Sequence, residues 1–226
     1  DAITYTMILV FQKTKKDNYK FVTSELNETS NALINLKKNE YLVSSTTLTE
    51  EPWDLSNSKT LKILQKMQEN SVTLDKFILK RIFYGIKTGR NNIFVIDKKL
   101  RDELVKDHKS EEVIKKVVTG TEVKRYNIDF DDKYILFLPW DYDLEFSPKI
   151  KEYLWVLTRY GSENVPFLSL PKIIYPRITN NSNFCLDESG EIFITDNNFY
   201  ISSSSKSLLA ILNSKLIFYY LMQKCP

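Results

Sequence analysis

The stretch from Gly85 to Asn92 gathers the side chains that are best suited to binding a polyanion. Its polar members are Lys87, Thr88, Arg90, Asn91 and Asn92. Lysine and arginine contact phosphate or guanine, and asparagine can bond an adenine edge at two points. We expect these residues to form a polar loop that joins two strands, at 82–84 and 93–96, and contacts nucleic acid. An ordinary hairpin loop, where Gly and Asn are also common, is the alternative.

A nucleotide-binding P-loop is a weaker interpretation of the same stretch. That motif needs a glycine, four residues and then Gly-Lys-Ser/Thr at the start of a helix. Here Lys87 and Thr88 precede the second glycine, and we expect the loop to enter a strand.

Two other segments carry cations near positions suited to recognition. Lys124 and Arg125 stand beside the aromatic Tyr126, which favours a backbone grip, although a solvated strand end would look the same. Pro176 is disfavoured inside a central strand, so it should mark a strand end or edge and leave Arg177 at a rim. There Arg177 would reach a base or phosphate, or form a surface ion pair.

Positive charge is concentrated in one part of the chain. The net charge of the whole chain is +3, yet residues 80–125 hold 13 basic and 7 acidic side chains, a net +6. Residues 126–170 carry a net −4, with 4 basic and 8 acidic side chains. Such asymmetry is typical of a surface that binds a polyanion, although a solvated helical face would also produce it.

Signals for catalysis and for metal binding are weak, and we predict that the chain has neither a catalytic nor a metal-binding residue. Glu122 and Lys124 form a nuclease-like Glu-x-Lys, a pattern that arises readily by chance in a chain with 27% charged residues. His108 is the one histidine, in a charged stretch, and Cys185 and Cys225 match no metal-ligand spacing. A metal-dependent nuclease using Glu122, Lys124 and an aspartate stays the main alternative, and an interaction scaffold is the third.

Periodicity and turn residues predict a mixed α/β (α+β) fold with β-sheets and flanking helices. Strands are expected at 3–11, 19–23, 134–138 and 172–178, with a hairpin over 184–201. Helices are expected at 27–36, 58–69, 98–105 after an Asp97 cap, 110–118, 148–159 and 204–223. We place a domain boundary near residue 72, giving segments 1–72 and 73–226.

No targeting or membrane signal is visible. The sequence has no run of about 18 apolar residues and no basic-then-apolar signal peptide at its start. Because it also begins without methionine, we expect a cytoplasmic piece of a longer protein.

Five short segments, in this order, resemble the TaqI-like C-terminal specificity domain of adenine-specific DNA methyltransferases and type IIG restriction–modification enzymes. They are residues 1–10, Tyr84 to Asn91, Thr121 to Tyr126, Lys172 to Pro176 and Leu208 to Leu216. The resemblance implies a DNA target-recognition domain over 73–226, preceded by the last strand of a methyltransferase domain and linker helices.

The same resemblance implies what this chain would receive from its parent enzyme. Linked methyltransferase and nuclease domains would use S-adenosylmethionine and magnesium, and this chain would need no cofactor of its own. It contains no Asn/Asp-Pro-Pro-Tyr/Phe signature. The resemblance therefore predicts a reader of double-stranded DNA that is separate from the catalytic domains.

Overall fold

The chain divides into two compact units, Asp1–Ser71 and Val72–Pro226. The computed structural model describes residues 10, 19–24, 40–48, 50, 53, 55, 58–78, 82–107, 109–139, 142–154 and 165–224. The strand expected at 3–11 and the helix expected at 27–36 lie outside these residues. No helix in the described ranges has the length and apolarity to span a bilayer.

The described residues of the first unit form an antiparallel strand pair and one longer helix. Strand β1 (Lys20–Ser24) pairs with β2 (Glu40–Ser44), and a 3-10 turn, η1 (Ser45–Thr47), follows directly. Helix α2 spans Ser58–Glu69, as the spacing of its apolar residues predicts, and it buries Leu64.

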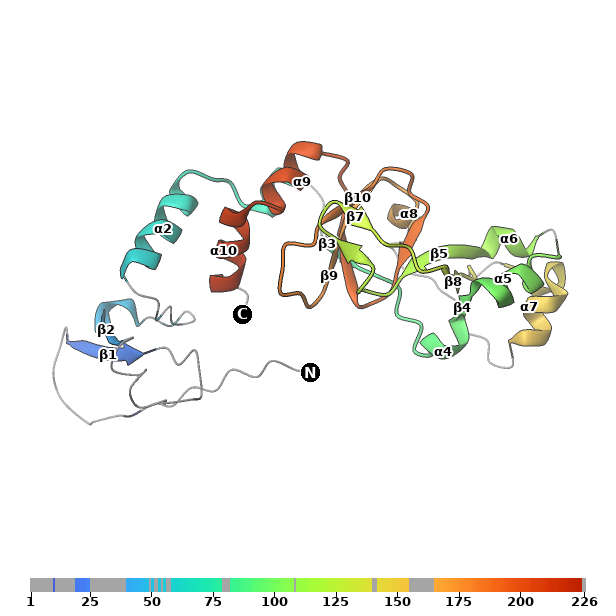
Figure 1. The fold of residues 1–226 in the computed structure, drawn as a ribbon, viewed down its shortest axis with the longest axis horizontal. Helices are drawn as coiled ribbons and strands as arrows, with labels where there is room; N and C mark the ends of the chain where they lie inside the picture. The colour runs from blue at the N-terminus through green and yellow to red at the C-terminus, as the bar shows by residue number, and fades with distance from the viewer. Residues whose placement is uncertain are drawn as a thin grey trace. The chain divides into compact units, whose positions relative to one another are not determined.

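Two four-stranded sheets form the second unit (Figure 1). The first sheet is antiparallel, in the order β10 (Cys185–Asp187), β9 (Lys172–Pro176), β12 (Asn198–Ile201) and β3 (Ile82–Tyr84). The second has the order β11 (Ile192–Ile194), β5 (Ile114–Val118), β8 (Lys133–Leu136) and β4 (Val95–Asp97), with β11 parallel to β5. Strands β6 (Val123–Lys124) and β7 (Asn127–Ile128) form a separate two-stranded hairpin that pairs with neither sheet.

The inner faces of the two sheets share one core. Ile174 and Tyr200 from the first sheet and Val117 and Ile135 from the second lie in the same buried cluster. Phe83 adds ring stacking against Tyr200, with the centroids 5.2 Å apart. Because side chains alternate along a strand, each sheet is left with a second apolar face that needs a cover.

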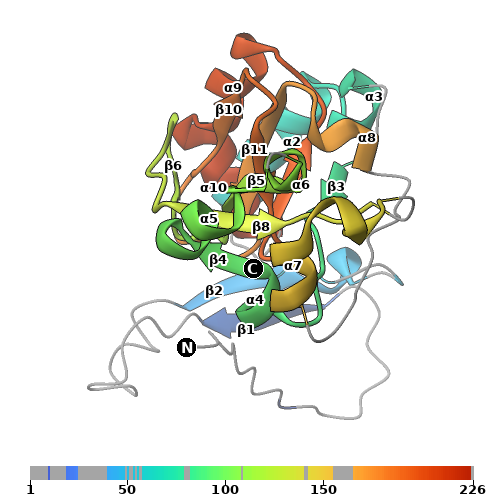
Figure 2. The same cartoon turned by 90° about the vertical axis from the view of Figure 1, so that its right-hand side faces the viewer.

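Helices cover both outer faces, giving the second unit helix, sheet, sheet and helix layers (Figures 1 and 2). The outer face of the first sheet, including Ile173, packs against α3 (Leu74–Ile78), α9 (Lys206–Leu212) and α10 (Lys215–Lys224). The outer face of the second sheet, including Leu136, packs against α5 (Lys98–Leu104) and α7 (Pro148–Tyr153). The short segments α4 (Asn91–Phe94), α6 (Ser110–Val113), η2 (Leu144–Phe146) and α8 (Val165–Leu168) complete the unit.

These layers confirm the predicted mixed α/β class and several of its elements. Asp97 caps α5, because its carboxylate accepts a hydrogen bond from the Leu100 amide at 2.8 Å. Strand β8 is interior, between β5 and β4, as its apolar run predicts. Helix α7 begins at the predicted Pro148, and residues 155–159 of the predicted helix lie outside the described ranges.

The helix predicted at 110–118 is wrong. Only Ser110–Val113 is helical, and Ile114–Val118 is a strand at the centre of the second sheet. Glu111 and Glu112 favour a helix start. The residues of β5 are mostly β-branched, and they pair with β8 on one side and β11 on the other. Sheet burial thus outweighs the local preference for helix.

The hairpin predicted over 184–201 is also wrong. Strand β10 pairs with β9 in the first sheet, whereas β11 pairs with β5 in the second. The turn at 188–191 therefore crosses between the sheets. The helix predicted at 204–223 is divided into α9 and α10, because buried Asn213 bonds both backbone groups of Phe184 and Ser214 caps α10.

Candidate functional site

The 85–92 loop joins the two sheets and enters a helix, so the expected strand–loop–strand arrangement is wrong. Strand β3 belongs to the first sheet and β4 to the second, with helix α4 between the loop and β4. At its start Gly85 lies against β11, where an added Cβ would sit 2.2 Å from the Thr195 carbonyl oxygen. Ile86 donates to the Ile194 carbonyl at 2.7 Å, so the base of the loop is anchored between the sheets.

One polar residue of this loop is buried and holds its shape, whereas the other four are exposed. Thr88 is only 3% exposed, and its hydroxyl accepts from the Arg90 amide at 3.1 Å and bonds the Asn91 side chain. The Thr88 hydroxyl therefore shapes the loop from within. Lys87 and Asn92 are exposed, as are Arg90 and Asn91.

The other predicted segments meet at one edge of the sheets. In the register of the first sheet, Pro176 at the end of β9 faces Asn198 at the start of β12. The Arg177 amide donates to the Asn197 carbonyl at 2.8 Å, just beyond that pair. Asn198 also donates its side-chain amide to Val118 at the end of β5, which joins the second sheet to the same edge.

An open cleft of about 510 Å³ lies at this edge. It brings together Lys124 and Arg177, which are 53 residues apart in sequence and were both predicted to bind DNA. Seven of its eleven lining residues have polar side chains. The lining residues are Thr119, Gly120, Thr121, Val123, Lys124, Pro176, Arg177, Ile178, Thr179, Asn183 and Asn197.

The hairpin β6–β7 presents the predicted cations Lys124 and Arg125 in exposed positions. Tyr126 at its tip is half exposed and has a φ of 66°, which is rare for a residue with a side chain. Its amide donates to the Phe184 carbonyl at 3.0 Å, and Asn213 donates to that same oxygen at 2.8 Å. The conformation of the tip is thus held by the segment that also carries Asn183 into the cleft.

Glu122, the acid of the nuclease-like pattern, is 5% exposed and fully engaged. One oxygen accepts from the Thr119 and Gly120 amides at 3.0 and 2.9 Å. The other accepts from the Thr119 hydroxyl at 2.8 Å and the Lys133 ammonium at 2.9 Å. Burial alone would raise the pKa of Glu122, but these hydrogen bonds outweigh it and lower that pKa to about 2.

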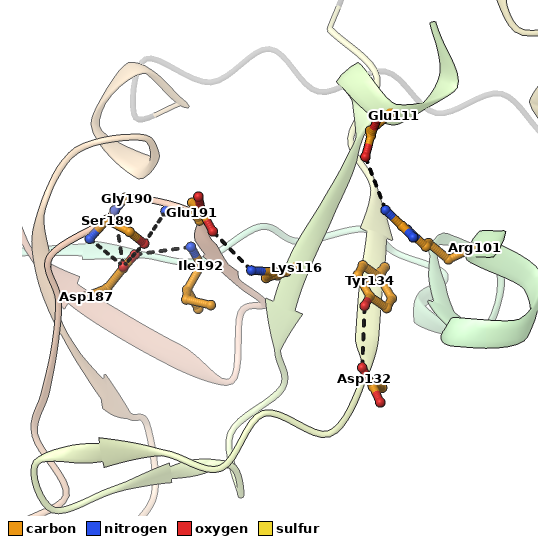
Figure 3. A network of polar contacts seen from close by, with 10 residues as sticks. All are labelled: Arg101, Glu111, Lys116, Asp132, Tyr134, Asp187, Ser189, Gly190, Glu191 and Ile192. Carbon is orange, nitrogen blue, oxygen red and sulfur yellow. Dashed lines mark hydrogen bonds and ion pairs between the residues drawn. The ribbon is translucent and has the colours of Figure 1, made fainter. Parts of the chain in front are cut away.

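A second engaged carboxylate, outside the cleft lining, is that of Asp187, the last residue of β10 (Figure 3). Asp187 accepts hydrogen bonds from Ser189, from the Gly190 amide and from the Ile192 amide, and it pairs with the fully buried Lys172 at 2.6 Å. Burial would raise the pKa of Asp187, but Lys172 and the amide donors lower it overall.

Metal and thiol chemistry have little support in the described residues. No three His, Cys, Asp or Glu side chains in those ranges gather as a metal ion would require. His108 and Cys225 lie outside the described residues, and Cys185 is a buried free thiol whose pKa is raised to about 11, first by burial.

Sequence reasoning missed three residues of the cleft: Asn183, Asn197 and Ile178. Asn197 lies in the run Thr195-Asp196-Asn197-Asn198, which reads as turn chemistry and nothing more. Asn183 and Ile178 are likewise in loops after strands, and Ile178 is 83% exposed. Only the meeting of three chain segments reveals that these side chains share a surface with Lys124 and Arg177.

Comparison with known proteins found one matching family model and similar solved structures. Residues 115–225 match the TaqI-like C-terminal specificity domain. A solved structure of the Type IIL restriction-modification enzyme MmeI in complex with DNA is similar at 13% identity and a TM-score of 0.41. The similarity covers 59% of this chain and 20% of that one, so this chain spans far less than the length of the MmeI chain. None of the curated proteins matches.

The family match spans three of the five segments that resembled it, including the hairpin, strand β9 and helix α9. It covers every residue that lines the cleft. The family match over residues 115–225 therefore confirms the predicted resemblance to TaqI-like C-terminal specificity domains.

Proposed function

We propose that this chain recognises double-stranded DNA and acts as the target-reading part of a restriction–modification enzyme. The observation that carries the proposal is the cleft, where Lys124 and Arg177 meet inside a specificity domain. Arginine and lysine provide the phosphate contacts and guanine contacts of such surfaces, and asparagine adds two-point contacts to adenine.

The proposed DNA-facing residues fall into two groups. The cleft group is Lys124 and Arg177, to which we add Asn197 from the cleft lining and Arg125 and Tyr126 from the adjoining hairpin, which do not line the cleft. In the loop group, Lys87, Arg90, Asn91 and Asn92 would approach the duplex, with Thr88 holding the loop in shape.

The parent enzyme is proposed on the family resemblance. In it, a bacterial adenine methyltransferase of the type IIG class, with a linked nuclease, would use S-adenosylmethionine and magnesium in the cytoplasm. Residues 1–72 would then include the last strand of the methyltransferase domain and linker helices, and residues 73–226 the recognition domain. The present chain would bind DNA without modifying or cutting it.

Paired charge removals test the proposal. Lys124→Ala/Arg177→Ala and Lys87→Ala/Arg90→Ala each remove two positive charges from a proposed group. Lys98→Ala/Lys215→Ala removes the same charge from residues that do not line the cleft. Duplex affinity and melting temperature are measured for all three.

We expect the cleft pair to lose roughly 1–3 kcal/mol of binding for its arginine, and a similar loss for the loop pair. The control pair should lose much less, and all melting temperatures should stay close to that of the parent chain. Equal affinity losses in all three pairs would indicate binding by net charge alone. An unchanged cleft pair would reject the cleft as the reading surface.

A further inference from the structure

The Glu122 carboxylate accepts four hydrogen bonds next to the cleft, although Glu122 itself does not line it. Three of its four hydrogen bonds go to Thr119 and Gly120, which line the cleft. The fourth comes from Lys133 on β8, a fixed strand of the second sheet. The carboxylate thus fixes the conformation of this part of the cleft wall mainly through three bonds within the turn itself.

The turn that Glu122 holds also depends on its glycine. Gly120 has a φ of +139°, a conformation that glycine adopts readily and residues with side chains rarely adopt. An added Cβ on Gly120 would lie 3.6 Å from the Asn197 Cβ, so the turn also abuts the opposite wall. Displacing it would change the spacing between Lys124 and the wall that holds Asn197 and Arg177.

We infer that Glu122 is a positioning residue for DNA recognition: it fixes the Thr119–Gly120 turn so that both walls of the cleft meet the duplex together. The inference rests on the proposed function of the cleft. It replaces the metal-ligand role of the nuclease alternative, because a cation at Glu122 would have to displace Lys133 and the two turn amides.

Charge makes the test unusually clear. Glu122→Gln removes a negative charge and keeps the side-chain size, so simple Coulomb attraction would strengthen binding to phosphates. Positioning predicts the opposite, because the Gln amide presents N–H groups to donors. Lys133→Met removes a positive charge but leaves the three turn bonds, so Coulomb attraction predicts weaker binding and positioning predicts little change.

The experiment compares duplex affinity of the 226-residue chain and its variants below all melting temperatures. We expect Glu122→Gln to bind about tenfold more weakly, the equivalent of about 1.4 kcal/mol, and Lys133→Met to stay within about threefold. Asp187→Asn is the matched control: it also neutralises a buried carboxylate that holds a turn, but that turn does not line the cleft. It should keep affinity within about threefold of the parent chain.

Hydrogen exchange provides a readout that does not depend on DNA. The Thr119 and Gly120 amides should exchange faster in Glu122→Gln and at the parental rate in Asp187→Asn. If Asp187→Asn does not fold, Lys172→Met/Asp187→Asn replaces it, and Glu122→Asp replaces an unfolded Glu122→Gln.

The outcomes separate the two proposals. If the parent chain binds and Glu122→Gln binds equally or more tightly, the positioning role is overturned and the cleft proposal stands. Equal losses in Glu122→Gln and Asp187→Asn would reduce Glu122 to general stability and also overturn it. If the parent chain binds no duplex, the proposed function fails and the positioning role fails with it.

Discussion

At the scale of single residues, the hydrogen-bond donors around Glu122 change the interpretation of the Glu-x-Lys pattern. Glu122 with Lys124 looks like part of a nuclease motif in sequence, but in the structure Lys124 faces the cleft and Glu122 faces inward. Its partner is Lys133, nine residues past the motif. A buried carboxylate with four donors is stable as an anion, which suits support better than proton transfer.

The lowered pKa of Glu122 predicts how stability changes in acid. Its pKa is about 2 in the folded chain, against an ordinary value of 4.5, so the unfolded chain binds the proton first. Its contribution, roughly 3 kcal/mol at most, is therefore present above pH 4.5 and is lost as the pH falls from 4.5 towards 2. Urea unfolding across this range should show a smaller loss for Glu122→Gln than for the parent chain. Parallel stability curves for the two proteins would contradict the assignment.

We predict that the Asn197 side chain contacts a DNA base. Its side chain lines the cleft beside Arg177, and a two-point amide contact discriminates a base pair by about 1–3 kcal/mol. Selection from randomised duplexes should therefore show Asn197→Ala losing preference at one position while keeping the others. Asn70→Ala in the first unit serves as the control and should retain the parental preference. Loss of preference at every position would instead indicate a collapsed cleft.

At the scale of elements, the crossings between sheets impose the tightest steric requirements. The 85–92 loop leaves β3, passes β11 and enters α4, so its first residue lies against the backbone of another strand. Gly85 meets this requirement by having no side chain. Gly89, in the same loop, has open space around it and a φ of +69°.

These two glycines give a matched pair for thermal unfolding. Gly85→Ala would place its Cβ 2.2 Å from a carbonyl oxygen, so the backbone must shift, at a cost of typically 1–3 kcal/mol for overpacking. Gly89→Ala meets no atom within 4 Å and bears only the backbone cost of a positive φ, about 1 kcal/mol. Gly85→Ala should therefore melt at the lower temperature. The reverse order would mean that the close crossing at β11 is not maintained.

At the scale of the whole molecule, the excess positive charge of residues 80–125 is only partly available to a partner. Lys98 pairs with Asp132, and Lys116 pairs with Glu191 (Figure 3); both acids lie outside residues 80–125, so neither is counted in the net +6. These exposed pairs add little stability, but they neutralise charge that the sequence alone would assign to DNA binding.

The salt dependence of duplex affinity measures how much of this positive charge contacts DNA. With three to five phosphate contacts, each adding about −0.9, the slope of log affinity against log salt should be roughly −2.7 to −4.5. The Lys124→Ala/Arg177→Ala variant should have a shallower slope by up to about 2, if both cations contact phosphates. A flat dependence for the parent chain would mean that its positive charge faces something other than a polyanion.

The sequence by itself determined the mixed α/β class, helix α2, the Asp97 cap and the interior strand β8, because each depends on neighbours within a few residues. It also indicated the family and the cations Lys124 and Arg177. Local signals failed where a strand's partner lies far along the chain, as with β5, which reads as helix until β8 and β11 pair with it.

Only the tertiary structure decided which of these residues share a surface. The cleft is assembled from three segments, near residues 119–124, 176–183 and 197. They meet because β5, β9 and β12 all have ends at one edge of the two packed sheets. Strand order follows from burying both faces of each sheet, a property of the whole core that no short segment encodes. The residue types that could read DNA were therefore visible in the sequence, whereas their arrangement around one cleft was not.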